Sequence, residues 1–307
     1  MGFQKAKREQ VYVKILLTSP SGGGKSYSAL KIATGLFGKC GGAGIAYIGT
    51  EGSRDKYYAN EFDYDLMQLD SYSVGSYMDA IDEAVDGGYK VLIIDSITPE
   101  WQWLNDQHSK AAGNSFQNWA PLKAKHKQFM DKILLSDIHV IACARGKAEW
   151  VVEDSETGKK VPKKVGMGAD QDKNISFDYT VSFQLDQATH NATADKDNTH
   201  LFDEIRVLSE KDGELLYDWA NSGEKPAPKA ASKPSAAEKV DIDENEELIG
   251  TMKKAWSGLS TKAKTPIKKK LKELGVSSFD ELMDLPTEQI KELSDLFKAS
   301  DDDDDED

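Results

Sequence analysis

The sequence predicts an α/β fold in which helices cover a mostly parallel β-sheet. Over residues 11–218, short segments rich in β-branched and aliphatic residues alternate with helix-like segments, a pattern typical of parallel strands joined by helical crossovers. Residues 91–94 are apolar at every position, as expected for a strand that is buried on both faces. With 307 residues and a hydrophobic fraction of 39%, we expect one large domain, residues 1–220, and a smaller part after it.

The order of the expected elements follows from these alternating segments. Strands are expected at residues 11–18, 46–49, 66–69, 91–95, 139–144, 180–185 and 205–208. Helices are expected at residues 25–37, 74–85 and 121–135. Residues 150–165 have the pattern of a hairpin-like excursion, placed after the strand that ends near Ala144.

The C-terminal part has a different composition. Residues 221–245 are rich in Pro, Ala, Lys, Ser and Glu, which is typical of a flexible linker. Residues 246–257, 266–274, 279–285 and 288–297 have amphipathic helical patterns, so 246–299 is predicted to be a small helical module. Residues 300–307 form an acidic tail that cannot bury apolar surface and should be disordered.

Several classes of protein are disfavoured. The longest apolar runs are far too short to span a membrane, so no membrane partner is expected. The first ten residues are polar and basic, unlike a secretory signal. Cys40 and Cys143 form no metal-binding or disulfide pattern, which favours a reducing cytoplasm.

A glycine-rich loop follows the first expected strand and leads into a helix. Glycines let successive backbone N–H groups converge on phosphate oxygens, and the helix adds its positive N-terminal end. Lys25 would pair with the β- and γ-phosphates and Ser26 would bind Mg²⁺, although Ser19 stands where the usual first glycine would be. We therefore expect ATP and Mg²⁺ to bind, with these nucleotide-binding residues: Ser19, Pro20, Ser21, Gly22, Gly23, Gly24, Lys25, Ser26 and Tyr27.

Charged residues end three other strands. Asp95 follows the apolar strand and is the second predicted Mg²⁺ residue. Ser96 stands where many P-loop ATPases carry a catalytic glutamate, so the attacking water needs another base, and Glu51 is a carboxylate at the end of the strand 46–49. Arg145 and Lys147 follow the strand 139–144 and are candidates to stabilise the γ-phosphate, within the chain or across a subunit interface. Ordinary surface or loop roles for these charges remain open.

Together these segments resemble the phage RecA-like P-loop ATPases, and more narrowly the phage nucleotide-binding proteins classed as single-strand annealing recombinases. The matching segments are residues 19–26, 47–52, 93–98 with Trp101, and 139–147. The resemblance implies a RecA-like core, catalysis through Glu51, and ATP-dependent binding of single-stranded DNA for annealing or strand exchange in phage recombination or replication. It also implies a homo-oligomer, as a ring or filament, and a single-strand-binding protein as partner.

Two basic regions are candidates for DNA binding. The first is the excursion, with Trp150 to stack on a base and lysines to neutralise phosphates, namely Lys159, Lys160, Lys163 and Lys164. The second is residues 251–272, which hold eight lysines and Trp256. A solvated hairpin and a solvated helical face are the alternatives. The last seven residues supply −7 of a net charge of −14, and we hypothesise that this tail competes with DNA or recruits a replication or recombination partner.

Two other functions remain open. A small-molecule P-loop kinase usually has an arginine-rich lid, but the chain has four arginines and no evident lid after the loop. A non-catalytic module, in which ATP only switches DNA or partner binding, is the other alternative.

Overall fold

The structure is a computed structural model and describes residues 5–110, 119–154, 160–224, 242–259, 264–273, 282 and 287–302. For the described residues between 148 and 167, the structure defines the backbone alone. The chain divides into two compact units, Met1–Pro226 and Ala227–Asp307. No helix in these ranges is both long and apolar enough to cross a membrane.

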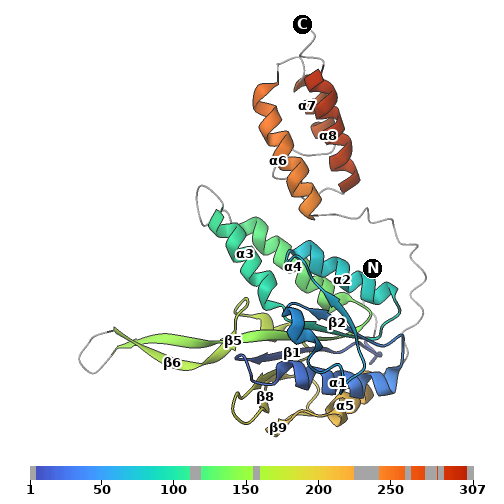
Figure 1. The fold of residues 1–307 in the computed structure, drawn as a ribbon, viewed down its shortest axis with the longest axis vertical. Coiled ribbons are helices and arrows are strands. Elements are labelled where there is room, and N and C mark those ends of the chain that lie inside the picture. Colours follow the sequence, from blue (N-terminus) through green and yellow to red (C-terminus); the bar gives the residue numbers. More distant parts are fainter. Residues whose placement is uncertain are drawn as a thin grey trace. The chain divides into compact units, whose positions relative to one another are not determined.

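The N-terminal unit is built on one large sheet with the strand order β3-β2-β4-β5-β1-β7-β8-β9 (Figure 1). From β3 to β7 in this order, every neighbouring pair is parallel, whereas β8 and β9 add in antiparallel fashion. The strands are β1 Lys14–Ser19, β2 Ile45–Gly49, β3 Asp65–Gln68, β4 Val91–Asp95, β5 His139–Asp154, β6 Lys160–Ala169, β7 Val181–Leu185, β8 Asn191–Asp197 and β9 Arg206–Val207. The predicted α/β class with a mostly parallel sheet is confirmed.

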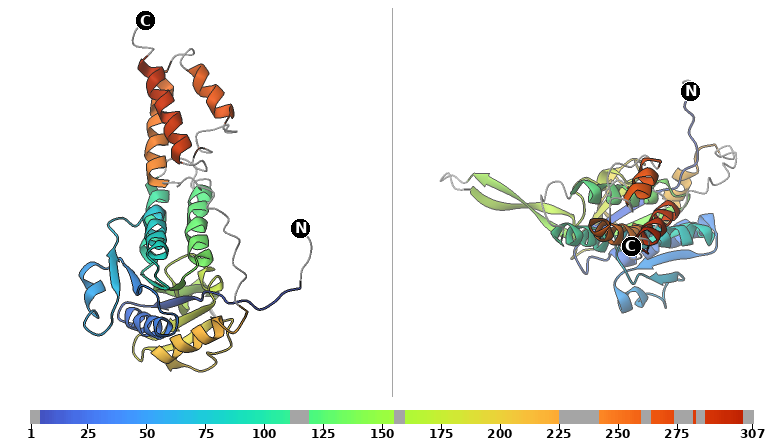
Figure 2. Two further views of the ribbon diagram at one scale, coloured as in Figure 1. Left: turned by 90° about the vertical axis from the view of Figure 1, so that its right-hand side faces the viewer. Right: turned by 90° about the horizontal axis from the view of Figure 1, so that it is seen from above.

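Helices cover both faces of this sheet, as Figures 1 and 2 show. One face carries α1 and α5, and the other carries α2, α3 and α4. The helices are α1 Lys25–Cys40, α2 Val74–Asp86, α3 Thr98–Lys110, α4 Trp119–Leu135 and α5 Glu210–Ala220. Cover on both faces explains why every residue of β1, β2 and β4 is buried.

Helices α1 and α5 cross closely because glycine lies at the contact on each helix. A Cβ atom on Gly35 of α1 would collide with the carbonyl oxygen of Glu210, and one on Gly213 of α5 would collide with that of Ile32. Their missing side chains let the two backbones approach. This contact holds α5 against the helix that follows the phosphate-binding loop.

The excursion predicted after Ala144 is a two-stranded antiparallel arm. β5 continues past the sheet to Asp154 and pairs with β6 from Gly146↔Ala169 to Asp154↔Lys160, with an irregularity between Glu149 and Trp150. The arm projects from the side of the sheet (Figures 1 and 2). The strand is longer than expected from residues 139–144 because β6 supplies hydrogen-bond partners beyond the sheet edge.

The C-terminal unit contains α6 Ile242–Gly258, α7 Lys264–Glu273 and α8 Thr287–Asp302. Its core is a separate apolar cluster that includes Met252, Ile267 and Leu293, and the Trp256 ring lies 5.9 Å from that of Phe297. Two expected boundaries need correction, because α6 begins inside the predicted linker 221–245 and α8 runs into the predicted tail as far as Asp302. Residues 303–307 and most of the expected helix 279–285 lie outside the described residues.

Candidate functional site

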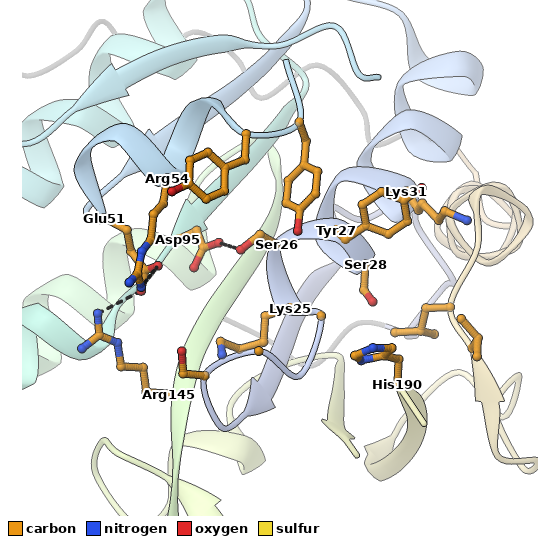
Figure 3. A pocket seen from close by; sticks show the side chains of 17 residues that line it. Lys25, Ser26, Tyr27, Ser28, Lys31, Glu51, Arg54, Asp95, Arg145 and His190 are labelled. Carbon is orange, nitrogen blue, oxygen red and sulfur yellow. Dashed lines mark hydrogen bonds and ion pairs between the residues drawn. The ribbon is translucent and has the colours of Figure 1, made fainter. Parts of the chain in front are cut away.

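A cavity of about 700 Å³ opens at the sheet edge where the parallel strands β1, β2 and β4 end and where β5 leaves the sheet. Carboxyl ends of parallel strands are the usual ligand-binding edge of such sheets. Lys25 and Ser26 lie in the middle, Glu51, Arg54, Asp95 and Arg145 lie on one side, and His190 lies on the other (Figure 3). Residues from strands far apart in the sequence therefore share one site.

The glycine-rich loop has the backbone that a phosphate-binding turn requires. Gly22 and Gly24 have φ of 80° and 82°, a left-handed conformation that glycine adopts without steric cost. A Cβ atom on Gly23 would collide with the Ser19 side chain. α1 begins directly at Lys25, so the free N–H groups of its first turn face the cavity edge.

The Lys25 ammonium lies over this loop. Its Nζ atom donates to the carbonyl oxygens of Ser19 at 2.9 Å and Pro20 at 3.1 Å. Of the nine predicted binding residues, six line the cavity: Ser21, Gly22, Gly24, Lys25, Ser26 and Tyr27. Ser19, Pro20 and Gly23 instead shape the loop and hold the lysine.

The predicted Mg²⁺ residues are in direct contact. Ser26 Oγ donates to Asp95 Oδ2 at 2.5 Å, and Tyr47 Oη donates to the same oxygen at 2.9 Å. Burial raises the pKa of the Asp95 carboxyl, although the hydrogen bonds from Ser26 and Tyr47 and the nearby Lys25 charge lower it. A buried carboxylate beside a hydroxyl is a hard-oxygen donor set that fits Mg²⁺.

The rest of a magnesium shell would come from phosphate oxygens and water, as is usual for this ion. In keeping with this, the described residues contain no group of three or more His, Cys, Asp or Glu that could hold a metal by themselves.

Glu51 lies two residues beyond the end of β2 and faces two arginines. Its Oε1 atom accepts from Arg145 Nη2 at 2.9 Å, and Arg54 Nη1 lies 3.8 Å from Oε2. Thr50 fixes the position of this segment, since its N–H and its Oγ1 both donate to the Asp95 carbonyl. The geometry thus brings the predicted base and one predicted cation to the same cavity as Lys25.

Lys147 is not part of this site, contrary to the expectation from sequence. Its Nζ atom lies 3.0 Å from Asp170 Oδ1, and the side chain lines a different cavity. Asp170 is held close to β5 because its N–H donates to the Arg145 carbonyl at 2.6 Å. The acidic partner therefore draws Lys147 away from the nucleotide site.

The opposite end of the cavity is formed by residues that the sequence did not indicate. His190, Val207 and Leu208 line it, together with Lys31 from α1. His190 packs against Gly24, and Gln187 Nε2 donates to the Ser21 carbonyl at 2.8 Å. These side chains offer a mixed apolar and polar wall suited to a base and sugar.

The turn that carries His190 and Gln187 is held by Asp186. Its Oδ1 atom accepts from Thr189 N and Thr189 Oγ1, both at 2.8 Å, and these bonds lower the pKa of the Asp186 carboxyl. His190 has a φ of 57°. The Asp-x-x-Thr spacing is a turn signal, and it is the one local feature from which this turn could have been predicted.

The predicted DNA-binding residues fall on the arm. Trp150 lies opposite Lys164, and Lys160 and Lys163 also lie on the paired strands. Lys159 lies outside the described residues, and for the other four the backbone alone is described. Their role stays a prediction.

Comparison with known proteins identifies a family. A sequence model of a family described as an AAA domain matches residues 12–209, which include every cavity residue named above. Among solved structures, a KaiC-like protein from the hyperthermophilic archaeon Pyrococcus horikoshii is similar, with 15% identity, a TM-score of 0.35, and coverage of 63% of this chain and 81% of that chain. A comparison with curated proteins found no match.

Proposed function

Because the chain belongs to the AAA-domain family of P-loop ATPases, we propose that it hydrolyses ATP with Glu51 as the general base and couples this reaction to binding of single-stranded DNA. The observation that carries the catalytic part is the Glu51–Arg145 pair, which faces Lys25, Ser26 and Asp95 in one cavity. A phosphate-binding loop alone accounts for nucleotide binding. A carboxylate and a second cation at the same cavity supply what hydrolysis needs in addition.

Each group has a role that follows from its position. The loop N–H groups and the Lys25 ammonium hold the β- and γ-phosphates. Mg²⁺, when bound, would be held by Ser26 and Asp95 and would neutralise charge on the phosphate oxygens. The base and sugar would lie against the wall of His190, Val207 and Leu208. Because His190 and Glu51 lie on opposite sides of Lys25 (Figure 3), a nucleotide bound in this way directs its γ-phosphate toward Glu51.

In the reaction, the Glu51 carboxylate accepts a proton from water. The water oxygen forms a bond to the γ-phosphorus while the bond between that phosphorus and the bridging oxygen breaks, and ADP carries away the electron pair. Arg145 would leave Glu51 and pair with the γ-phosphate oxygens, where negative charge accumulates. One movement of Arg145 therefore releases the base and stabilises the transition state.

The biological context remains part of the proposal. It rests on the resemblance of the strand ends to phage annealing recombinases and on the lysine-rich regions of the chain. On this basis the protein would act in phage recombination or replication, supporting annealing or strand exchange as a homo-oligomer. The acidic C-terminal residues would recruit a single-strand-binding or replication protein.

The positions of the arginines disfavour a small-molecule kinase. Arg54 and Arg145 both face Glu51. Arg8 lies over the Trp219 ring, and Arg206 pairs with Asp212. Of the four arginines in the sequence, Arg54 and Arg145 line the nucleotide cavity, which is fewer than the arginine-rich lid of such a kinase would require.

The test is steady-state ATP turnover with and without an unstructured oligonucleotide. We expect DNA to stimulate the wild type, and Glu51→Gln to lower turnover by about 10²–10⁴-fold, the usual contribution of a general base, while ATP still binds. Glu83→Gln, which changes an exposed residue of α2 that does not line the nucleotide cavity, is the matched control. Negligible wild-type turnover with DNA present, together with a fully functional Glu51→Gln variant, would instead establish an ATP-gated, non-catalytic module.

A further inference from the structure

A second cavity of about 550 Å³ lies beside the nucleotide site and is lined by aromatic and basic side chains. α3 contributes Trp101, and α4 contributes Trp119 and Lys123. β5 contributes Lys147, and the segment that follows β6 contributes Lys173. We propose that this indole-lysine slot, defined by these five residues, binds an unpaired base and the flanking phosphates of single-stranded DNA. The inference rests on the proposed function and gives its DNA partner a specific site.

The aromatic wall of the slot is preassembled. The Trp101 and Trp119 rings are stacked, with centroids 5.9 Å apart and planes 26° from parallel. His108 stacks on Trp119 at 4.4 Å, and His126 meets Trp101 edge-on at 5.0 Å. Both indoles are half-buried, so each is held by its neighbours and keeps part of its surface for a ligand. Ordered aromatic faces of this kind stack on any unpaired base.

The charge of the slot matches a nucleic-acid backbone. Lys123, Lys147 and Lys173 are all exposed at its rim, and Asp172 is the acidic group among the described residues that line it. Lys147 shares its charge with Asp170, which also accepts from Gln102 Nε2 at 3.1 Å. The remaining positive charge favours phosphates over an acidic or apolar protein segment, and the planar indoles favour a base.

The slot is joined directly to the ATP site through β5. Arg145, which pairs with Glu51, and Lys147 lie two residues apart on this strand and therefore on the same side of it. Arg145 N donates to Thr98 Oγ1 at the start of α3, and Gln171 Nε2 donates to the Ile97 carbonyl at 2.7 Å. A base and phosphate bound against Trp101 and Lys147 would thereby act on the strand that carries Arg145. This linkage gives a physical route for DNA to stimulate hydrolysis.

The test is binding of a fluorescein-labelled oligothymidylate by the full-length protein, measured by anisotropy over a range of salt concentrations. We expect Trp101→Ala and Trp119→Ala to weaken binding about tenfold or more, as loss of one base stack does, and Trp119→Phe to restore most of it. Trp103→Phe is the matched control, because Trp103 lies on α3 against Lys125 and outside the slot. Affinity for a fluorescent ATP analogue should be the same in every variant.

Charge variants keep the test independent of the indoles. Lys123→Glu and Lys173→Glu alter exposed side chains and should lower both the affinity and its salt dependence, since each removes about one phosphate contact.

Three outcomes would overturn the inference in distinguishable ways. If the wild type binds no oligonucleotide at low salt, the slot and the DNA part of the proposed function both fail. If the wild type binds but the tryptophan and lysine variants bind equally well, the slot is wrong and the DNA function stands. If the wild type binds duplex DNA as tightly as single-stranded DNA, and if the tryptophan variants also bind the two with equal affinity, base stacking in the slot is excluded.

Discussion

The Arg145 guanidinium lies 2.9 Å from the Glu51 carboxylate, although Arg145 lies on β5 and Glu51 follows β2, which is not a neighbour of β5 in the sheet. β4, which ends in Asp95, runs between β2 and β5. The ion pair thus bridges across the magnesium-binding strand at the mouth of the nucleotide cavity. Because Arg145 donates to Oε1 of Glu51, the pair must open before this oxygen can accept a proton from water.

Replacement of Arg145 by alanine tests whether its pairing with Glu51 or its pairing with the γ-phosphate determines the rate of turnover. We expect Arg145→Ala to lower kcat by about 10²–10³-fold, as loss of a group that stabilises transition-state charge does, with little change in KM for ATP. Lys132→Ala removes a cation that pairs with Asp82 far from the cavity and should leave turnover unchanged. Faster hydrolysis by Arg145→Ala would show that the arginine only restrains Glu51.

Asp95→Asn should separate function from stability. Burial raises the pKa of Asp95, so the folded state binds a proton more tightly than the unfolded state does. This group therefore lowers the free energy of unfolding as pH rises through its unfolded and folded pKa values. At neutral pH without Mg²⁺, we expect Asp95→Asn to raise the Tm while it abolishes Mg²⁺-dependent turnover.

The measurement for Asp95→Asn is thermal unfolding at several pH values, together with ATP turnover. The gain in Tm should shrink at acid pH, where the wild-type carboxyl is protonated as well. A variant with a lower Tm than the wild type at every pH would contradict the sign of the effect.

His139 should make stability sensitive to acid. Burial, together with the charges of Lys14 and Lys90, lowers its pKa from 6.5 to about 4, and its Nδ1 atom accepts from Val13 N at 3.1 Å. The unfolded chain therefore binds the extra proton between pH 6.5 and about pH 4, and stability falls as pH falls through this window. The loss attributable to this one group is about 3 kcal/mol.

His139→Asn is the matching variant, because an asparagine oxygen can replace Nδ1 as acceptor. Chemical unfolding between pH 7 and pH 4 should show a shallower loss of stability for the variant than for the wild type. Equal slopes would mean that His139 is protonated in the folded protein.

The contact between α1 and α5 predicts that alanine substitutions at two glycines of α1 change the free energy of unfolding in opposite directions. A Cβ atom on Gly35 would collide with the Glu210 carbonyl, whereas one on Gly38 would meet no atom within 4 Å. We expect Gly35→Ala to lower the free energy of unfolding by about 1–3 kcal/mol through overpacking. Gly38→Ala should instead raise the free energy of unfolding by about 0.5–1 kcal/mol, because alanine is the better helix former. Thermal unfolding of both variants checks the pair, and equal shifts would disprove the close crossing.

The local parts of the site could be predicted from the sequence. The loop from Ser19 to Ser26 is contiguous, so its glycines, its lysine and the following helix can be recognised without any tertiary information. Asp95 and Glu51 could be predicted because parallel strands end at one edge of a sheet, which brings their terminal residues together. The sheet could be predicted from the alternating segments because strand and helix periodicities are properties of short stretches of sequence.

Some elements lacked a clear local pattern. The buried face of α3 includes Thr98, Pro99 and Glu100, so its apolar periodicity is weak. α5 carries Gly213 at its crossing with α1, a residue that lowers helix propensity and is explained only by the neighbouring helix. β8 is mostly polar and pairs at the antiparallel side of the sheet. Packing between elements, rather than local propensity, decides these three.

The sequence by itself determined that this chain has a phosphate-binding loop in a parallel α/β sheet with carboxylates at two strand ends. The tertiary structure alone decided which side chains share the cavity. Arg145 reaches Glu51 while Lys147 pairs with Asp170, and His190 comes to Gly24 from a turn far along the chain. Strand order, the pairing of β5 with β6 and long-range ion pairs set these contacts, and none of them is encoded in the spacing of neighbouring residues.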